Sequence, residues 1–375
     1  MKGVAKHFAC PNCKKEYSLS KMVFKCTDCK EMLDVKYDYS KAKKLVKHKD
    51  FKMLNPMHWK YFMFYPIENA NNVVSLFEGG TPLIKSDKIK ADVSFKYEGT
   101  NPTGSFKDRG STIEITKAVE NNADIVVCAS TGNMGASIAA YSTRAGLNCK
   151  IFLPTHVPKN KVEQIKCYGA NLEFIHGEYS VAVNHAEKFA RDQKCYLTGD
   201  YPFRCEGQKS IGFEISDQLG WNTPNYIICP VGNGTVIYSI WKAFNELKLV
   251  GLVKKLPKMI GMQAEGCSPV VDSFNEKFKE VKNIETARTV ANAIACEAPT
   301  YGNYALRAVR ESKGMMEKVS DRELIDAVRM LGSEGVFAEP AGAASVAGFM
   351  KLNKELKDSK VVCIISGHGL KDPII

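Results

Sequence analysis

The residues best suited to chemistry begin with Lys107, which lies in the segment NPTGSFKDRG at residues 101–110. A Gly-Ser turn precedes this lysine and helix-forming residues follow it, so we expect Lys107 in the first turn of a helix. A lysine amine does covalent chemistry as a Schiff base or when its pKa is depressed. A helix N-terminus and the apolar neighbour Phe106 would both disfavour the charged amine. Most lysines near a helix start are simply solvated, so the assignment depends on the rest of the chain.

Two glycine-rich turns each follow an apolar run that is typical of a buried parallel strand. The sequence STGNMG occupies residues 130–135, after the run IVVCA, and VGNGT occupies residues 231–235, after YIICP. A helical stretch follows each turn. This arrangement directs backbone N–H groups and the positive end of a helix dipole at an anion. Neither turn matches the dinucleotide-binding or Walker A pattern, so the sequence predicts a phosphate site of another kind.

A Schiff-base lysine together with a phosphate cradle points to pyridoxal 5′-phosphate, which carries an aldehyde and a phosphate on one ring. A third segment fits the same ligand. The apolar run KVVCII at residues 360–365 reads as a late buried strand, and SGHGLKDP follows it at residues 366–373. Ligands of open α/β sheets bind beyond the carboxyl ends of the strands, so we expect Ser366 at an edge of the ring.

Six segments in a fixed order carry a resemblance to a known family. They are NPTGSFKDRG, STGN, RCEGQKS (residues 204–210), VGNG, EGVFAEPAGAAS (residues 334–345) and SGHGLKDP. With them the chain resembles the threonine synthases of fold type II, the β-family of pyridoxal-phosphate enzymes, from about Cys10 to Pro373. The resemblance implies two open α/β domains with mostly parallel sheets around a cofactor cleft, and a small N-terminal zinc ribbon of the archaeal-like form.

The resemblance also implies roles for individual residues. Lys107 would hold the cofactor covalently and then move protons, Asn133 would bind the ring hydroxyl, and Ser366 would bind the pyridine nitrogen. The cofactor phosphate would lie on the loop formed by Gly232, Asn233, Gly234 and Thr235. The amino-acid substrate would be bound by Ser105, Ser130, Thr131 and Arg204, whose guanidinium can grip a substrate phosphate through two parallel hydrogen bonds.

The implied reaction converts O-phosphohomoserine and water to L-threonine and phosphate, but the sequence departs from the family pattern. Met134 stands where threonine is common, Thr198-Gly199 stands where Asn-Ser is common, and the phosphate loop reads GNGT. Each lost donor to a phosphate costs about 1–3 kcal/mol. Two alternatives therefore stay open: a threonine or serine dehydratase, and an O-phosphoserine-dependent enzyme similar to cysteate or cysteine synthase.

Four of the thirteen cysteines form a CxxC–x12–CxxC pattern, at Cys10, Cys13, Cys26 and Cys29. Two such pairs can close a tetrahedral zinc site. We expect the zinc to be structural because four protein ligands leave no position open for catalysis. The other nine cysteines are scattered, several of them inside apolar runs where a free thiol packs as a small hydrophobe, and this usage fits a reducing cytoplasm.

A zinc ribbon with a net charge of +11 raises nucleic-acid binding as the least favoured reading. The lysines are spread along the chain, and the lysine-rich stretch at residues 41–49 reads as the solvated face of a linker helix. We therefore expect a small-molecule amino-acid substrate and no nucleic acid.

The 375 residues suffice for two catalytic domains. We expect a ribbon at residues 1–34, a linker helix and entry segment at 35–92, a catalytic domain with the lysine at 93–198, and a second with the phosphate loop at 199–375. The chain has no apolar run long enough to span a membrane and no signal-peptide core at its start, which predicts a cytoplasmic protein. The family habit implies a homodimer.

Overall fold

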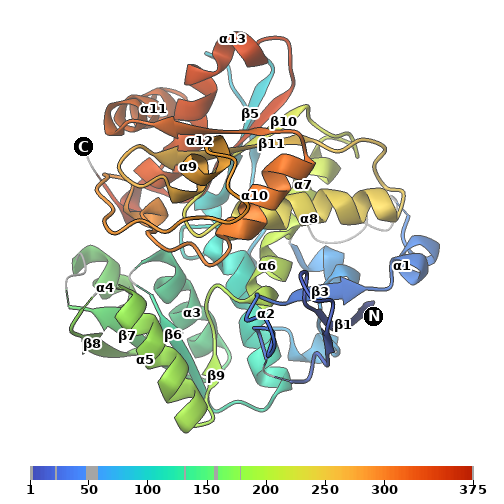
Figure 1. Ribbon diagram of the computed structural model, residues 1–375, viewed down its shortest axis with the longest axis vertical. Coiled ribbons are helices and arrows are strands. Elements are labelled where there is room, and N and C mark those ends of the chain that lie inside the picture. Colours follow the sequence, from blue (N-terminus) through green and yellow to red (C-terminus); the bar gives the residue numbers. More distant parts are fainter. Residues whose placement is uncertain are drawn as a thin grey trace.

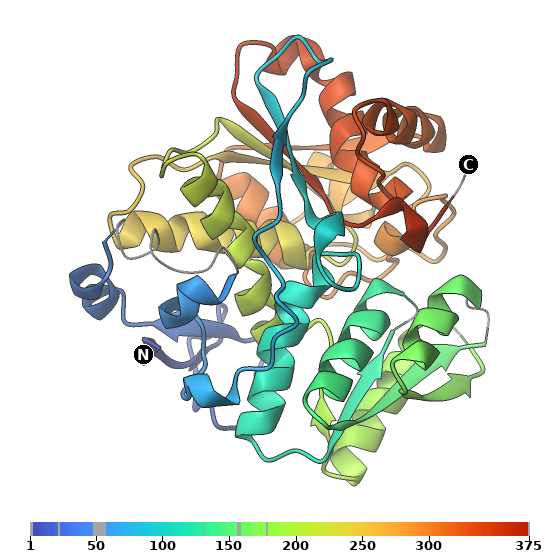
Figure 2. The same cartoon turned by 180° about the vertical axis from the view of Figure 1, so that it is seen from behind.

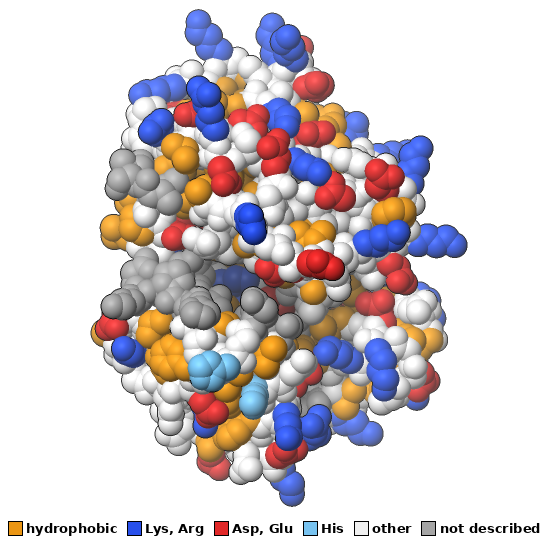
Figure 3. Space-filling view, turned by 60° about the vertical axis from the view of Figure 1, so that its left-hand side comes forward, with side chains coloured by type: hydrophobic (Ala, Val, Ile, Leu, Met, Phe, Trp, Pro, Cys, Tyr) orange, Lys and Arg blue, Asp and Glu red, His pale blue; other side chains and the backbone are white. Residues whose placement is uncertain are grey.

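Two sheets organise the catalytic part of this computed structural model, which describes residues 3–21, 23–47, 58–130, 132–155, 159–177 and 179–373. The larger sheet has the order β12-β11-β10-β13-β5-β4, and its neighbouring strands are parallel except for β4 and β5. The smaller sheet, β8-β7-β6-β9, is parallel throughout. The two sheets lie in separate parts of the molecule (Figure 1), and the surface between these parts is hollowed (Figure 3).

The strands have the following bounds. The larger sheet contains β4 (Leu83–Lys85), β5 (Val93–Tyr97), β10 (Tyr226–Pro230), β11 (Lys258–Ala264), β12 (Met315–Val319) and β13 (Val361–Ile365). The smaller sheet contains β6 (Ile125–Ala129), β7 (Asn148–Pro154), β8 (Asn171–Ile175) and β9 (Tyr196–Leu197).

The central strands are continuous apolar runs because helices cover both faces of each sheet. In β10, Ile227 and Ile228 pack into different hydrophobic cores, and Val126 and Val127 of β6 do the same. Successive side chains of a strand point to opposite faces, so an unbroken apolar sequence fills two cores at once. This is why the apolar runs in the sequence predicted buried parallel strands correctly.

Helices α8 and α10 pack on one face of the larger sheet and α12 on the other, with α11 packed on α12; α2 and α3 face α5 across the smaller sheet. No helix in the described parts of the chain is long and apolar enough to cross a membrane. The helix bounds are α1 (Tyr39–Leu45), α2 (Lys107–Glu120), α3 (Asn133–Arg144), α4 (Lys159–Cys167), α5 (Tyr179–Asp192), α6 (Pro202–Gln208), α7 (Ser210–Gln218), α8 (Thr235–Leu249), α9 (Pro269–Asn275), α10 (Gly302–Glu311), α11 (Asp321–Ser333), α12 (Pro340–Lys351) and α13 (Asn353–Leu356). The short 3₁₀ turns are η2 (His58–Phe64), η3 (Ala70–Asn72), η4 (Glu98–Thr100), η5 (Asn292–Ile294) and η6 (Gly369–Lys371).

The N-terminal ribbon is a separate antiparallel sheet of β1 (Ala5–Ala9), β2 (Glu16–Tyr17) and β3 (Asp34–Tyr37), in the order β2-β1-β3. Its last strand continues to Tyr37, past the expected boundary at residue 34. Sheet pairing also joins segments that the expected boundaries separate, because β5 pairs with β13 near the C-terminus. Figure 2 shows these strands side by side at the top of the molecule. The domain boundaries themselves stay a prediction.

A buried ion cluster fixes the start of α2 against the larger sheet. The guanidinium of Arg109 donates to both carboxylate oxygens of Glu98, at 2.6 and 2.9 Å, and to both of Glu214, at 2.9 and 2.8 Å. Lys96 adds a hydrogen bond to Glu214 at 2.8 Å. Arg109, Glu98 and Glu214 are all buried, so each charge has lost its hydration. Their stability in the interior therefore depends on the geometry of these pairs. The cluster joins α2 to β5, η4 and α7.

We expect Arg109→Met to lower the free energy of unfolding by about 3–5 kcal/mol at pH 7, because two buried carboxylates lose their partner. Burial alone would raise the pKa of Glu214, but Arg109 and Lys96 hold this pKa well below its ordinary range. A depressed pKa contributes stability above the unfolded-state value of 4.5 and loses it as the pH falls. In urea unfolding, the difference in the free energy of unfolding between parent and variant should therefore become smaller below about pH 4.5.

The matched control is Lys166→Met, which removes a cation from the exposed Lys166–Glu163 pair on α4. Exposed ion pairs contribute little to stability, so its urea midpoint should stay near that of the parent. The role given to Arg109 would be contradicted if both variants lowered the free energy of unfolding equally. It would also be contradicted if the difference between the parent and Arg109→Met grew at acidic pH.

Candidate active site

The neighbouring parallel strands β5 and β13 bring two of the sequence motifs together beside Lys107. The backbone N–H of Phe106 donates to the carbonyl of Ser366 at 3.0 Å, and Ser105 forms an isolated bridge with Gly367. The N–H of His368 donates to Gly104 at 2.9 Å. The turn before α2 thus pairs with the segment after β13, and Ser366 lies against Phe106, the residue before the lysine.

Lys107 is the first residue of α2, and its side chain is 17% exposed. Its amine lies 4.7 Å from the ring centroid of Phe106 and 3.9 Å from Oδ1 of Asp200. The sequence suggested that Phe106 would disfavour a charged amine as an apolar neighbour. The ring instead presents its face, which attracts a cation. Asp200 was not singled out from the sequence, although it directly follows the unusual Thr198-Gly199 pair.

The phosphate loop ends at the N-terminus of α8, where Gly234 has a φ of 96°. A Cβ at Gly234 would lie 2.6 Å from the carbonyl oxygen of Tyr301, so only glycine fits this close approach. Within the described residues no side-chain hydrogen bond caps α8, which is 15 residues long. The first N–H groups of such a helix need an acceptor, and a phosphate supplies one. Gly232 packs closely too, since its Cβ would lie 2.9 Å from Ile294.

The side chain of Asn233 is already engaged. Its amide donates to Oδ2 of Asp200 at 2.7 Å, and its oxygen accepts from the N–H and the hydroxyl of Thr300. Asn233 would therefore reach a phosphate through its backbone, while its side chain connects the loop to Asp200. Thr235, the first residue of α8, is buried.

Asn133 begins α3 and points across to the other catalytic domain. Its amide donates to both carboxylate oxygens of Glu339, at 3.0 and 3.1 Å. Its own oxygen is buried and has no hydrogen-bond partner among the described residues. An unsatisfied buried acceptor is costly unless a ligand group completes it, which fits the expected contact with a cofactor. Glu339 lies inside a quoted motif, but the sequence gave it no role.

The other expected substrate-binding residues have local roles as well. The hydroxyl of Ser130 accepts from the N–H groups of Gly132 and Gly135, at 3.4 and 2.8 Å, and so shapes the turn before α3. Ser105 is buried and accepts from the N–H of Lys107 at 3.4 Å. Thr131 lies outside the described residues.

Arg204 on α6 is fully buried next to the lysine segment. Its guanidinium forms an ion pair with Glu114 and donates to the carbonyl oxygens of Gly199, at 2.8 Å, and Lys107, at 3.3 Å. Burial raises the pKa of the Glu114 carboxyl to about 7, with Arg204 acting in the opposite direction. Arg204 thus ties the start of α2 to the loop before α6, a position that sequence spacing could not reveal. Its contact with a substrate phosphate stays a prediction.

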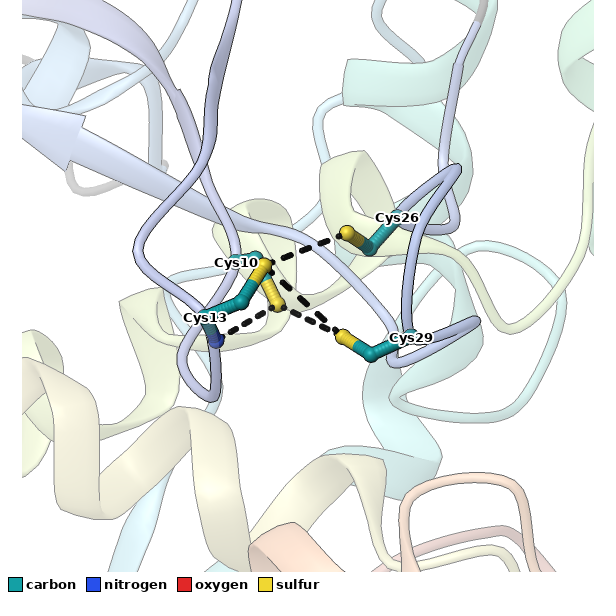
Figure 4. Close-up of side chains that lie close together, drawn as sticks. All are labelled: Cys10, Cys13, Cys26 and Cys29. Atoms are coloured by element: carbon teal, nitrogen blue, oxygen red, sulfur yellow. Dashed lines mark hydrogen bonds between the residues drawn. The ribbon is translucent and has the colours of Figure 1, made fainter.

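The four ribbon cysteines converge on one point, although 12 residues separate the two pairs. Their sulfur atoms all lie within 4.8 Å of one another, and single separations are 3.3 Å for Cys10–Cys29 and 3.5 Å for Cys13–Cys26 (Figure 4). Tetrahedral zinc with Zn–S bonds of about 2.3 Å holds its sulfurs about 3.8 Å apart. Hydrogen bonds from the Cys29 N–H and then the Tyr17 hydroxyl lower the pKa of Cys26 to about 6, which favours the ligating thiolate. The four residues fit a zinc ion.

The ribbon packs directly on the segment that holds Arg204. Phe8 lies 5.0 Å from Phe203, and Phe24 lies 5.0 Å from Tyr201, measured between ring centroids. The hydroxyl of Tyr37 donates to Glu206 on α6. The cysteine cluster, far from Lys107 in sequence, is thus connected to the lysine segment through α6.

Comparisons with known proteins agree with this geometry. Residues 74–367 match the family model described as "Pyridoxal-phosphate dependent enzyme". The chain is 40% identical to the threonine synthase of Methanocaldococcus jannaschii, over 97% of this chain and 92% of that protein. It is 42% identical to the threonine synthase of Methanosarcina acetivorans, over 98% and 92%.

Solved structures show the same fold at lower identity. Maize serine racemase superimposes with a TM-score of 0.68 at 22% identity, over 79% of this chain and 89% of that one. Threonine deaminase isoform 2 from Solanum lycopersicum gives a TM-score of 0.68 at 22% identity, over 83% and 89%. The expected fold type II architecture is thereby confirmed. Together with the close relatives, it establishes that the chain belongs to the threonine synthase family of pyridoxal-phosphate-dependent enzymes.

Proposed function

We propose that this protein converts O-phosphohomoserine and water to L-threonine and phosphate. The near-full-length identity to threonine synthases carries the proposal, and the convergence of Lys107, the α8 N-terminus and Ser366 supports it. The racemase and deaminase structures share only the fold at this identity, so they do not favour the dehydratase alternative. No observation favours an O-phosphoserine-dependent enzyme either.

The residues of this chain would divide the work as follows. The N–H groups at the start of α8 bind the cofactor phosphate, Asn133 orients the ring through its unsatisfied oxygen, and Ser366 meets the ring nitrogen. Bound pyridoxal phosphate supplies an aldehyde that bonds to amines and a ring that withdraws electrons from the substrate's α-carbon. Lys107 first holds this aldehyde and then moves protons at the substrate carbons.

The substrate itself would lie between the two catalytic domains. The N–H groups of the turn from Ser130 to Asn133 bind its α-carboxylate. Ser105 precedes the first turn of α2 and so lies at the same end of that helix as Lys107. Arg204 donates to the carbonyl oxygen of Gly199 at 2.8 Å, in the segment where the family usually provides Asn-Ser, and we assign the leaving phosphate to it. Met134 supplies no donor to that phosphate, so Arg204 carries more of its binding than in relatives with threonine there.

The zinc ion is proposed to be structural. All four ligands come from the ribbon, and a closed set of four thiolates leaves no coordination site for a substrate. Its effect on activity would pass through the packing of the ribbon on α6.

A reducing cellular compartment and a homodimer belong to the same proposal. All thirteen cysteines are free thiols, nine of them outside the zinc cluster. Free thiols in this number are typical of a reducing cytoplasm. The homodimer follows from the family habit, and size-exclusion chromatography with light scattering would test it.

We expect Lys107→Ala to lose the visible absorption band of the cofactor-bound protein, because no other amine takes the place of Lys107. Borohydride reduction of the parent, followed by peptide mapping, should locate the cofactor on Lys107. Lys166→Met on the exposed face of α4 is the control and should retain both band and label. A label on another lysine would refute the assignment of the active site.

We expect one zinc ion per chain by metal analysis of protein purified under reducing conditions. Cys26→Ser/Cys29→Ser should lose the zinc and lower the unfolding midpoint, while the cofactor band stays nearly intact in the folded fraction. The control is Cys167→Ser, because Cys167 is exposed and lies outside the cluster. Protein without zinc, or equal zinc in both variants, would argue against the site.

The phosphate role of Arg204 needs a paired variant, because Arg204→Ala alone would leave Glu114 buried without its partner. We expect Arg204→Ala/Glu114→Gln to lower kcat/KM for O-phosphohomoserine by roughly 10- to 150-fold, the effect of one lost charged hydrogen bond. Glu114→Gln alone retains the guanidinium and should keep the parent KM or lower it.

Two further measurements separate this role from the alternatives. Met134→Thr restores the usual donor and should improve turnover of O-phosphohomoserine. The second measurement supplies O-phosphohomoserine, O-phosphoserine or threonine as the single substrate. In each case the formation of phosphate, threonine and oxoacid is measured. Oxoacid from threonine, with no phosphate released from O-phosphohomoserine by parent or variant, would replace the proposal with a dehydratase.

A further inference from the structure

Asp200 is a largely shielded carboxylate that none of the expected roles uses. Its side chain is 14% exposed and lies between Lys107 and the phosphate loop. Oδ2 accepts a hydrogen bond from Asn233 at 2.7 Å. Oδ1 lies 3.9 Å from the amine of Lys107 and is buried without a hydrogen-bond partner in the described part of the chain. One oxygen of Asp200 is thus anchored, while the other faces the lysine.

The backbone on both sides of this contact is fixed. Gly199 donates its N–H to Glu114 at 3.0 Å and accepts from Arg204 at 2.8 Å. Arg204 also donates to the carbonyl oxygen of Lys107 at 3.3 Å. One buried guanidinium therefore connects the residue before Asp200 to Lys107 itself. Since Arg204 and Glu114 are both nearly free of solvent, the approach of Asp200 to the amine is built into the packing.

On the basis of the proposed function, we propose that Asp200 is a positioning residue for Lys107. It holds the lysine ammonium in place during the part of the reaction in which the lysine is not bonded to the cofactor. It also couples that state to the phosphate loop through Asn233.

The charge balance of the step requires such a partner. Once the substrate's amine has replaced it, Lys107 is a neutral amine. It then accepts the proton that leaves the substrate's α-carbon, while the electron pair of that C–H bond stays with the substrate. The lysine becomes an ammonium in a pocket that is mostly closed to water, where a free charge is unfavourable. A carboxylate at about 4 Å stabilises this ammonium and orients it for return of the proton.

Other titratable groups surround the pair and bear on its pH dependence. Glu114 on α2 and Arg204 on α6 form the ion pair beneath it. Asp200 contributes to raising the pKa of Cys205 on α6 and of Cys296 in the loop after η5, although burial is the larger cause for both. These thiols are therefore neutral near pH 7, so Asp200 is the anion that faces the amine most directly.

Asp200→Asn in the cofactor-bound enzyme tests the inference, because the amide retains an oxygen for Asn233 and removes only the charge. Without substrate, the pH transition of the visible band should move to lower pH by about one unit, the effect of losing an opposite charge nearby. With O-phosphohomoserine, kcat should fall tenfold or more, with KM within about threefold of the parent. Asp200→Glu should restore part of both effects.

Asp192→Asn, at the exposed end of α5, is the control for removing one negative charge and should match the parent. An unchanged band transition and kcat in Asp200→Asn would overturn the inference. If Asp200→Asn does not fold, Asp200→Ser gives the same test, because it also removes the charge. If neither variant folds, Asp200 has a structural role instead. A parent that forms no threonine would refute the proposed function, while the substrate-free titration would still decide the role of Asp200.

Discussion

The placement of the first turn of α2 is the constraint on which the rest of the site depends. Arg109, two residues after Lys107, is clamped by Glu98 and Glu214 in a region closed to water. Buried charges of this kind tolerate little displacement, because their attraction must offset the loss of hydration. Most helices in an α/β domain are positioned by close apolar packing. Here buried ion pairs fix the helix that carries Lys107.

A second constraint reaches the same place from the opposite side. The ribbon holds Tyr201 and Phe203 between its aromatic side chains, and these residues flank the start of α6. Arg204 follows immediately and bonds to the backbone of Lys107. A small ribbon with little apolar core gains rigidity from bound metal. Zinc bound to the four cysteines, as proposed, would therefore stabilise the surface on which α6 rests, and this gives a physical reason for the ribbon.

The sequence predicted those features that are local or periodic. The apolar runs at β6, β10 and β13 indicated parallel strands correctly because a strand buried on both faces needs an unbroken apolar sequence. The segment after β13 lies beside the turn before α2, where Phe106 donates its N–H to Ser366, because carboxyl ends of parallel strands share one edge; the contact of Ser366 with the cofactor ring stays a prediction. The spacing of Cys10, Cys13, Cys26 and Cys29 likewise predicted that their sulfur atoms meet, since each pair forms its own turn; the zinc ion itself stays a prediction. The parallel α/β class followed from these patterns, whereas the family came from the resemblance carried by the six ordered motifs.

The remaining features could not be read from the sequence because they join residues that are distant along the chain. The pairing of Arg204 with Glu114 spans 90 residues, and that of Asn133 with Glu339 spans 206. In the sequence, Asp200 cannot be distinguished from an acidic residue on the surface, because only the fold shields its carboxylate from water and places it beside a cation. Glu114 forms an ion pair with Arg204, and Asp200 lies 3.9 Å from the amine of Lys107. For Arg204 to bind the leaving phosphate as proposed, its guanidinium has to share or give up its pairing with Glu114, because both partners are buried and no water replaces either one.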